Sequence, residues 1–519
     1  MTAKAHYKNI TKGLDNNVND LKSNLYSVRF DIGNQHDVQE DFTLPDYMSE
    51  VRRIVSCKAS VLPENLFIDQ TELVLSGLVM YTVLYVGDDG KLTNADLNSE
   101  YTARIGCGAC DLSGLSAESI PYVTQLISCT CRATGPRRLS LSARMCTKAV
   151  SAVQGKHTEI ITDKSDCTEK SRCDANDIAL ERHVLELDST DVVRHSTTGS
   201  ISGSFRENSE SKIISCNATM GVTDIRQDER FIKVSGSAYL NCLFMTPDSK
   251  YYSVKERCPF EETVSVGGSV KKVKGDVSAV ARCAGINITG SDNGEYKWEL
   301  EYDLDLLRDT PHTSCLTDDI YSTSFETDCE LEDISRLVCL KNGNSRLSLN
   351  GSRLLGGGEK SLVQANGRVV TDRAEYSSDG HLNISGSCIV QAIIDEEGTL
   401  KSEEITIPVK FECAGKPSDG ICHVLCSVDV LNTELKLDGD KLTADAELCI
   451  SYLAYAVNKT SCVASCTVDT SHPLDFGRSC VRVYFPEERE TLWDIGKKYH
   501  CKPDKIEVLG KNMPVIINV

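Results

Sequence analysis

Two closely spaced cysteine pairs come nearest to a metal-binding pattern in this chain. Cys107-Gly-Ala-Cys110 is followed by Cys129-Thr-Cys131, which approximates the spacing of a zinc ribbon. The first pair has the two-residue spacing that suits zinc, whereas the second has a single intervening residue and chelates less well. Cys129 and Cys131 would also share one face of a strand, where packing explains them equally well. We therefore expect no metal, with these four cysteines as the weak candidate cluster.

Motifs for catalysis find little support in the sequence. Gly356-Gly-Gly-Glu-Lys-Ser361 is similar to a phosphate-binding loop, but Glu359 separates the glycines from the lysine, so the phosphate cradle cannot form. The sequence has no His-Glu-x-x-His motif and no serine in a nucleophile elbow, and its 10 histidines are scattered. We expect a protein that is not an enzyme and that uses no cofactor.

The end of the chain holds the strongest candidate for a binding site. Glu490-Thr-Leu-Trp-Asp-Ile-Gly-Lys-Lys-Tyr499 predicts a helix with a threonine as N-cap and lysines near its end. Leu492, Ile495 and Tyr499 form one apolar stripe, which favours a place in a core. Trp493 lies off this stripe, where it can project into a partner, although burial in the core remains the alternative. The predicted protein-binding residues are Trp493, Leu492, Ile495, Lys497 and Tyr499.

Further signals complete a small module around this helix. Val481-Arg-Val-Tyr-Phe485 has the alternation of a strand, and Pro514-Val-Ile-Ile517 supplies a closing strand. Pro503 can open a second short helix between them. These segments predict a compact β-α-α-β module at residues 479–519.

One strand motif is repeated three times upstream of this module, each time around a glycine. The copies are Thr71-Glu-Leu-Val-Leu-Ser-Gly77, Arg230-Phe-Ile-Lys-Val-Ser-Gly236 and His381-Leu-Asn-Ile-Ser-Gly386, and each continues into a second apolar stretch. Residues at even steps from the glycine are apolar in all three copies. Because side chains alternate along a strand, this shared phase predicts one buried face in each copy. A glycine in the buried row predicts a bend or a bulge.

The spacing of the three glycines sets the domain organisation. They are about 150 residues apart, a domain spacing that exceeds the period of a solenoid. Short strands between turns, without helical periodicity, predict a mainly β row of tandem β-sandwich-like repeat domains. A serine- and glycine-rich stretch around 195–212 has the composition of a loop. The predicted divisions are a polar extension at 1–36, β repeat domains at 37–155, 178–310 and 325–458, and the α+β module at 479–519.

Charge and hydropathy restrict the partners. The chain has 56 Lys plus Arg against 76 Asp plus Glu, a net charge of −20. This balance argues against nucleic acid, which needs a basic footprint, and against anionic lipid. No apolar run approaches the roughly 18 residues of a membrane span, and the N-terminus lacks the pattern of a signal peptide. We expect a cytoplasmic protein without membrane insertion.

Cysteine is abundant, at 24 residues, and is spread through strand-like segments. Free thiols on strands pack as small apolar side chains, which favours reduced cysteines. The alternative is an exported adhesion protein with disulfides. A count of thiols under denaturing conditions separates the two interpretations.

The C-terminal module resembles a LysM domain through Glu490-Thr-Leu-Trp-Asp-Ile-Gly-Lys-Lys-Tyr499 and Pro514-Val-Ile-Ile517. LysM domains usually bind N-acetyl sugars of peptidoglycan or chitin, so the resemblance implies glycan binding. Glu507-Val-Leu-Gly-Lys-Asn-Met513 departs from the family pattern, because it lacks the usual Leu-Asn-Gly turn and is shortened before the last strand. Those residues would line part of the sugar groove, which counts against glycan binding here.

The upstream units resemble a spore-associated repeat domain. The first copy carries this resemblance in Val38-Gln-Glu-Asp-Phe-Thr-Leu-Pro-Asp46, Ser49-Glu-Val-Arg-Arg-Ile-Val55 and the strand around Gly77. Tandem copies before a terminal LysM module are similar to the SipL-type spore coat morphogenetic proteins. That resemblance implies a scaffold in the mother-cell cytoplasm, at the forespore surface.

The same resemblance implies the partners. The LysM-like module would bind the morphogenetic ATPase of the coat basement, and the β-domains would self-associate or bind other coat proteins. The alternative function is that of a peptidoglycan-binding protein that acts through LysM.

Overall fold

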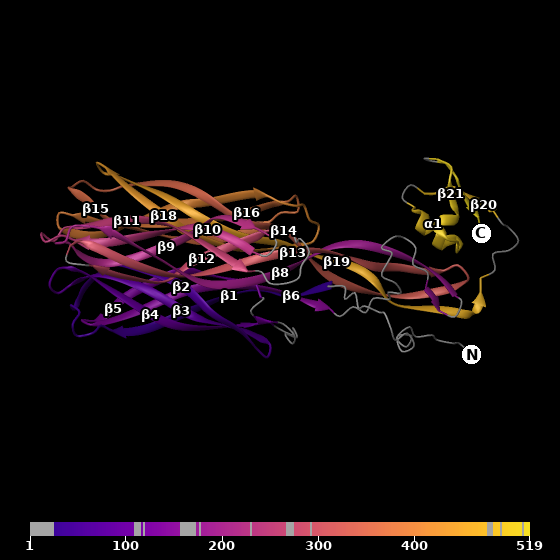
Figure 1. The fold of residues 1–519 in the computed structure, drawn as a ribbon, viewed down its shortest axis with the longest axis horizontal. Helices are drawn as coiled ribbons and strands as arrows, with labels where there is room; N and C mark the ends of the chain where they lie inside the picture. Colours follow the sequence, from indigo (N-terminus) through magenta and orange to yellow (C-terminus); the bar gives the residue numbers. More distant parts are fainter. Residues whose placement is uncertain are drawn as a thin grey trace.

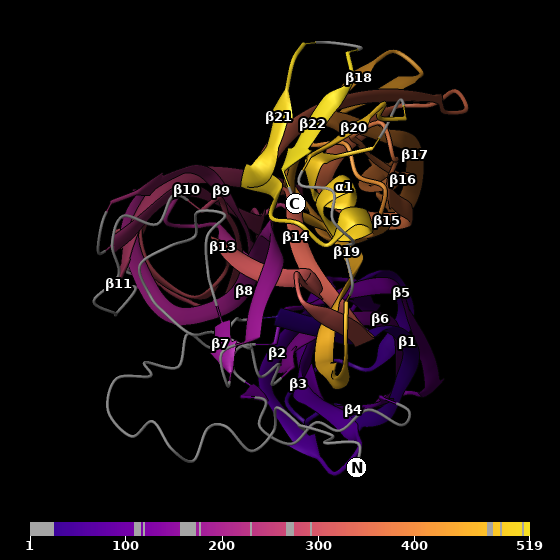
Figure 2. The same ribbon diagram turned by 90° about the vertical axis from the view of Figure 1, so that its right-hand side faces the viewer.

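The chain is described here by a computed structural model (Figures 1 and 2). It is mainly β, as the sequence predicts, and its secondary structure includes an eight-residue α-helix near the C-terminus. The residues that the structure describes are 25–107, 116–117, 120–155, 173–175, 178–228, 231–265, 275–290, 293–474, 481–487, 490–510 and 513–518.

Unit 1 consists of two three-stranded antiparallel sheets around one apolar core. The first sheet has the order β1 (Leu25–Thr43), β6 (Arg138–Gly155), β5 (Tyr122–Gly135). The second has the order β2 (Val51–Asp69), β3 (Glu72–Gly87), β4 (Leu92–Gly106). Strand β1 begins inside the segment expected to be a polar extension, because it pairs with β6 along its whole length.

Units 2 and 3 repeat this strand order around cores of their own. In unit 2, the first sheet has the order β8 (Ile178–Arg206), β13 (Glu295–Ser322), β12 (Val277–Gly290), and the short strand β7 (Cys173–Ala175) pairs with the other edge of β8. The second sheet of unit 2 has the order β9 (Lys212–Gln227), β10 (Phe231–Met245), β11 (Tyr251–Ser265). In unit 3, the first sheet has the order β14 (Phe325–Leu354), β19 (Lys441–Pro473), β18 (Ile421–Asp438). The second sheet of unit 3 has the order β15 (Lys360–Tyr376), β16 (His381–Glu396), β17 (Thr399–Ala414).

The three glycine-centred segments occupy the same place in each unit. They form β3, β10 and β16, the middle strand of the second sheet. A Cβ atom at Gly77 or Gly386 would collide with the backbone of the neighbouring strand, and one at Gly236 with the Phe260 ring and a backbone oxygen. In each case the neighbouring strand has one extra residue beside the glycine. The predicted bulge therefore exists, in the strand next to the glycine.

The three units lie side by side around a common centre (Figure 2). Leu84, Leu243 and Ile393, which hold the same position after their glycines, belong to one apolar cluster shared by all three units. Contacts between units are cyclic: β4 touches β9, β11 touches β15, and β17 touches β2. The units therefore surround an approximate threefold axis, whereas the sequence suggested a row.

Most of the segment around 195–212, expected as a loop, lies in β8. Gly199 and Gly203 stand directly opposite Tyr302 and Trp298 of β13, whose rings lie so close that a Cβ atom would not fit. Aromatic side chains that cover glycines across a strand pair stabilise strands of low intrinsic propensity. The loop prediction is wrong because composition does not reveal the partner strand. The connection itself comprises residues 207–211.

Two strand pairs run beyond the units and form a stalk (Figure 1). Strands β8 and β13 remain paired as far as Ser322, and β14 and β19 remain paired as far as Pro473. These ends lie past the predicted domain limits at 310 and 458, by roughly 12 to 15 residues, or about 45 Å of strand. Two small apolar clusters join the pairs, one with Leu180, Ile320, Val463 and Cys466, the other with Leu316 and Cys462.

Candidate functional site

The C-terminal module is a three-stranded sheet that packs against one helix (Figure 1). Its elements are β20 (Val481–Tyr484), α1 (Leu492–Tyr499), β21 (Ile506–Val508) and β22 (Val515–Asn518), with β22 in the middle of the sheet. A single 3-10 turn, Pro503–Lys505, stands where a second helix was predicted. That prediction is wrong because the next residues pair with β22, and Ile506 is buried in the core of the module.

Helix α1 begins at the predicted N-cap. The Thr491 hydroxyl accepts a hydrogen bond from the backbone N–H of Asp494 at 3.2 Å, and the Asp494 carboxylate accepts one from the backbone N–H of Thr491 at 2.9 Å. The bond from the Thr491 backbone is the main reason why the pKa of Asp494 is lowered, since it stabilises the charged carboxylate. His500 ends the helix in the left-handed conformation, with φ of 49°.

The five predicted protein-binding residues lie in three different environments. Ile495 is buried in the core of the module, and Tyr499 is half-buried beside it. Leu492 remains 40% exposed. Trp493 and Lys497 face the stalk of the same chain.

Asp319 of β13 holds α1 against the stalk. Its carboxylate accepts a hydrogen bond from the Trp493 indole at 2.9 Å and from the Lys497 ammonium at 2.7 Å. Tyr321 packs edge-on against the indole, with ring centroids 4.8 Å apart, and donates to the carbonyl of Cys501 at 2.6 Å. Burial raises the pKa of Tyr321, so its hydroxyl stays protonated as a donor. We use the name clamp for Asp319 and Tyr321 of the stalk together with their partners Trp493, Lys497 and the carbonyl of Cys501.

Sequence reasoning missed the clamp, because Asp319 and Tyr321 lie between two predicted domains. The one available signal was the run Cys315-Leu-Thr-Asp-Asp-Ile-Tyr321, in which β-forming residues follow the supposed end of the domain at 310. A small residue was also needed on the helix. A Cβ atom at Gly496 would press on the Tyr321 hydroxyl, so glycine permits the close approach.

Exposed apolar side chains gather on this module. It contains half of the large apolar side chains that are exposed in the described part of the chain, namely Val481, Val483, Phe485, Leu492, Val508, Leu509 and Met513. Val483 lies opposite Ile516 of β22, and both alternate with residues that pack towards α1. We define the outer sheet face as Val481, Val483, Phe485 and Ile516. Val483 and Phe485 on it are 63% and 70% exposed.

The candidate cysteine cluster is only partly assembled in the described residues. Cys107 is buried in the core of unit 1, whereas Cys110 lies outside the residues that the structure describes. Cys129 and Cys131 contact Cys57, which the spacing argument did not include. Hydrogen bonding to these two thiols, Cys129 foremost, raises the pKa of Cys57. Across the described ranges, no group of three or more His, Cys, Asp or Glu side chains is placed to hold a metal ion.

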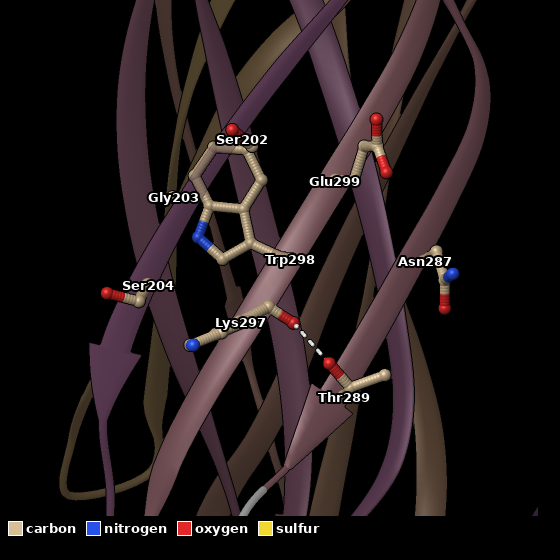
Figure 3. Close-up of a pocket in the computed structure, with 8 residues that line it drawn as sticks. All are labelled: Ser202, Gly203, Ser204, Asn287, Thr289, Lys297, Trp298 and Glu299. Atoms are coloured by element: carbon tan, nitrogen blue, oxygen red, sulfur yellow. Dashed lines mark hydrogen bonds between the residues drawn. The ribbon is translucent and has the colours of Figure 1, made fainter.

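Two other places have less to offer chemically. Lys360 of the glycine-rich loop pairs with Glu396 at 3.4 Å, so its ammonium is already engaged. A hollow of about 450 Å³ on unit 2 is lined by strands β8, β12 and β13 (Figure 3). Trp298 lies across Gly203 there, and the polar side chains around it point in different directions (Figure 3). Nothing in this hollow converges on a ligand.

Comparison of the chain with protein-family models, with curated proteins and with solved structures finds no match. Among the residues described, no helix combines the length and the apolar character that crossing a membrane requires. The function must therefore be argued from the residues of this chain.

Proposed function

We propose that the protein is a non-enzymatic scaffold of the spore envelope, and that its LysM-like module binds the ATPase of the coat basement. The site of action would be the forespore surface, on the mother-cell side. The resemblance of residues 37–519 to SipL-type proteins supports the biological setting. The observation that carries the binding role is the apolar outer sheet face of the C-terminal module.

The position of the module suits an adaptor. The three units form one ring, and the stalk extends from it to the module, which sits at the far end (Figure 1). A partner on the module would therefore not collide with the ring. The ring leaves the outer surfaces of three units available for other coat proteins or for further copies of the chain.

The composition of the outer sheet face favours a protein over a sugar. Val481, Val483, Phe485 and Ile516 present aliphatic and aromatic carbon, and the exposed carboxylate of Glu507 lies beside Ile516 on the same face. Contiguous exposed apolar surface of this kind marks protein interaction sites. The partner binding predicted for Trp493 and Lys497 stays a prediction, since the stalk engages both side chains in this structure.

Peptidoglycan binding is the alternative, and it rests on the resemblance to LysM. Sedimentation with purified sacculi separates the two functions. Strong co-sedimentation of the full chain would favour the glycan-binding function, whereas the scaffold function predicts that the chain stays in the supernatant.

Deletion of residues 479–519 tests the scaffold function in sporulating cells. Recovery of the coat-basement ATPase with the tagged chain, measured by quantitative mass spectrometry, should fall by at least about tenfold, because the binding energy of interfaces is concentrated in a few residues. The ring should remain folded in the deletion variant, which circular dichroism checks. Undiminished recovery of the ATPase would contradict the proposal.

A further inference from the structure

A cavity of about 570 Å³ lies where the three units meet. Its wall comes from β2 to β5 of unit 1, β9 and β12 of unit 2, and β15 and β18 of unit 3. Ser60, Asp96 and Asn98 in this wall are exposed, so water reaches them. The wall carries three basic and two acidic side chains, Lys58, Arg282 and Arg368 against Asp96 and Asp429.

The three units meet at three interfaces, which we call seams. At two of these seams a side-chain amide forms a hydrogen bond to the neighbouring unit, and at the third, within the described residues, the equivalent residue does not. At equivalent positions after the glycine, unit 3 has Gln391, unit 2 has Asn241 and unit 1 has Thr82. Gln391 accepts from the Ser56 hydroxyl at 2.9 Å, and Asn241 donates to a backbone carbonyl of β15 at 3.1 Å. Thr82 is shorter and donates to Asp96 of its own unit at 3.0 Å. Among the described residues, the seam between units 1 and 2 therefore lacks an amide bridge at this position, and the Lys58 ammonium reaches across it to the Asn217 amide instead.

Ser215 of β9 borders this seam and lines the cavity. It occupies the position in unit 2 that Ser56 occupies in unit 1, and it is 5% exposed. Among the described residues, its hydroxyl has no hydrogen-bond partner. A buried hydroxyl without a partner costs stability, so this donor would gain from a ligand.

Lys58 brings an uncompensated positive charge to the same wall. Its ammonium lies 3.4 Å from the amide oxygen of Asn217, two residues along β9 from Ser215. Within the described ranges it forms no ion pair with a carboxylate. Burial lowers the pKa of Lys58, because the charged form loses hydration there. Among the residues that the structure describes, the amide N–H₂ of Asn217 has no hydrogen-bond acceptor and is a further donor.

Most of the other charges in the wall already have partners. Arg282 donates to Asp305 at 2.8 Å, and Asp305 accepts a second bond from Arg194. Arg368 donates to a carbonyl of β5 at 3.1 Å. Asp429 accepts from a serine two residues away and lies near Arg282. Within the part of the chain that the structure describes, Lys58 is thus the basic group of the wall with neither a carboxylate nor a backbone carbonyl as partner, only the amide oxygen of Asn217.

We propose that this cavity binds a small oxyanion, a phosphate or a carboxylate, through Lys58, Ser215 and Asn217. The ammonium supplies the charge, while the hydroxyl and the amide supply directed hydrogen bonds from the opposite unit. The ligand would connect units 1 and 2 at the position where the other two seams have an amide bridge. Its concentration then sets part of the stability of the ring, by mass action. This site is independent of the C-terminal module and of its partner.

Calorimetry and thermal unfolding of the full chain test this site. Inorganic phosphate and acetate are each compared with sodium chloride at equal ionic strength, which separates the two sources of oxyanion. At least one of them should bind saturably and raise the Tm. Lys58→Met keeps an unbranched side chain of about the length of the lysine methylene stem and removes a buried charge, so the ring should stay folded. It should weaken binding about tenfold to a hundredfold, the usual loss for one charge-assisted hydrogen bond.

Lys255→Met is the matched control. Lys255 also lies at a seam between units, where burial lowers its pKa and it donates to the carbonyl of Thr433, but it is not part of the cavity wall. This variant should bind the anion as the unaltered chain does. Equal binding by Lys58→Met, or the absence of saturable binding of both anions, would overturn the proposal.

Discussion

The ring of three units and the C-terminal module differ in how they are held. The ring has an apolar cluster to which every unit contributes, with Leu84, Leu243 and Ile393 among its members, and each unit contacts the next in a closed cycle. The module meets the stalk through the clamp, in which two side chains of β13 contact groups on and after α1. Further contacts accompany the clamp: Lys502 with Glu181, the His500 ring with the carbonyl of Ser322, and the His183 ring with Trp493. The comparison teaches that two kinds of contact hold parts of one chain together. Buried apolar side chains join the three units of the ring, whereas a small set of polar and aromatic contacts holds the C-terminal module.

Among the variants considered, the largest loss of stability is expected from a substitution in the ring. Gly386→Ala places a Cβ atom against the carbonyl of Val370 and the Cα atom of Thr371, neither of which can move without breaking the strand pair. We expect a loss of about 3 kcal/mol or more in the free energy of unfolding, as for other overpacked cores. Urea denaturation measures it.

Gly106→Ala is the control for that variant. Gly106 is the last residue of β4, an edge strand of a second sheet, and open space surrounds the position of its Cβ atom. Its unfolding free energy should change by less than about 0.5 kcal/mol. Equal destabilisation by the two variants would mean that the glycine row has no special role in these sheets.

A smaller effect is expected at the clamp. Asp319→Ala removes the acceptor of both Trp493 and Lys497, so the module should separate from the stalk in a fraction of molecules while the ring stays folded. Acrylamide quenching of tryptophan fluorescence measures the release. Trp298 is 4% exposed, so an increase in quenching reports Trp493.

Asp328→Ala provides the control for the clamp, because Asp328 is an exposed carboxylate of the stalk, whereas Asp319 is half-buried. Quenching should remain that of the unaltered chain. If Asp319→Ala also leaves quenching unchanged, the module is held by contacts other than the clamp.

The sequence made the ring partly predictable. The phase of alternation around Gly77, Gly236 and Gly386 identified the middle strands and their buried faces, because burial imposes a period of two on each strand by itself. The closure of the units into a ring was not predictable. Leu84 and Leu243 lie on the face opposite the core of their own unit, and the arrangement of the units buries them.

The C-terminal module likewise has features that the sequence predicts and features that it does not. Thr491 and the capping box could be predicted, since they depend on residues three positions apart. The environment of Trp493 could not, because it depends on Asp319, which lies 174 residues earlier in the chain. The third strand at Ile506–Val508 was missed for a related reason: three residues carry too short a pattern to indicate a strand before its partner is known.

Recovery of the coat-basement ATPase by two point variants tests the central claim most directly. Val483→Glu places a charge on the outer sheet face, and Trp493→Glu places one on the side of α1 that meets the stalk. If the partner binds the outer sheet face, Val483→Glu should lower recovery by at least about tenfold, as for a residue at the centre of an interface, while Trp493→Glu retains it. Loss of recovery with Trp493→Glu and full recovery with Val483→Glu would contradict the account and return the binding site to α1.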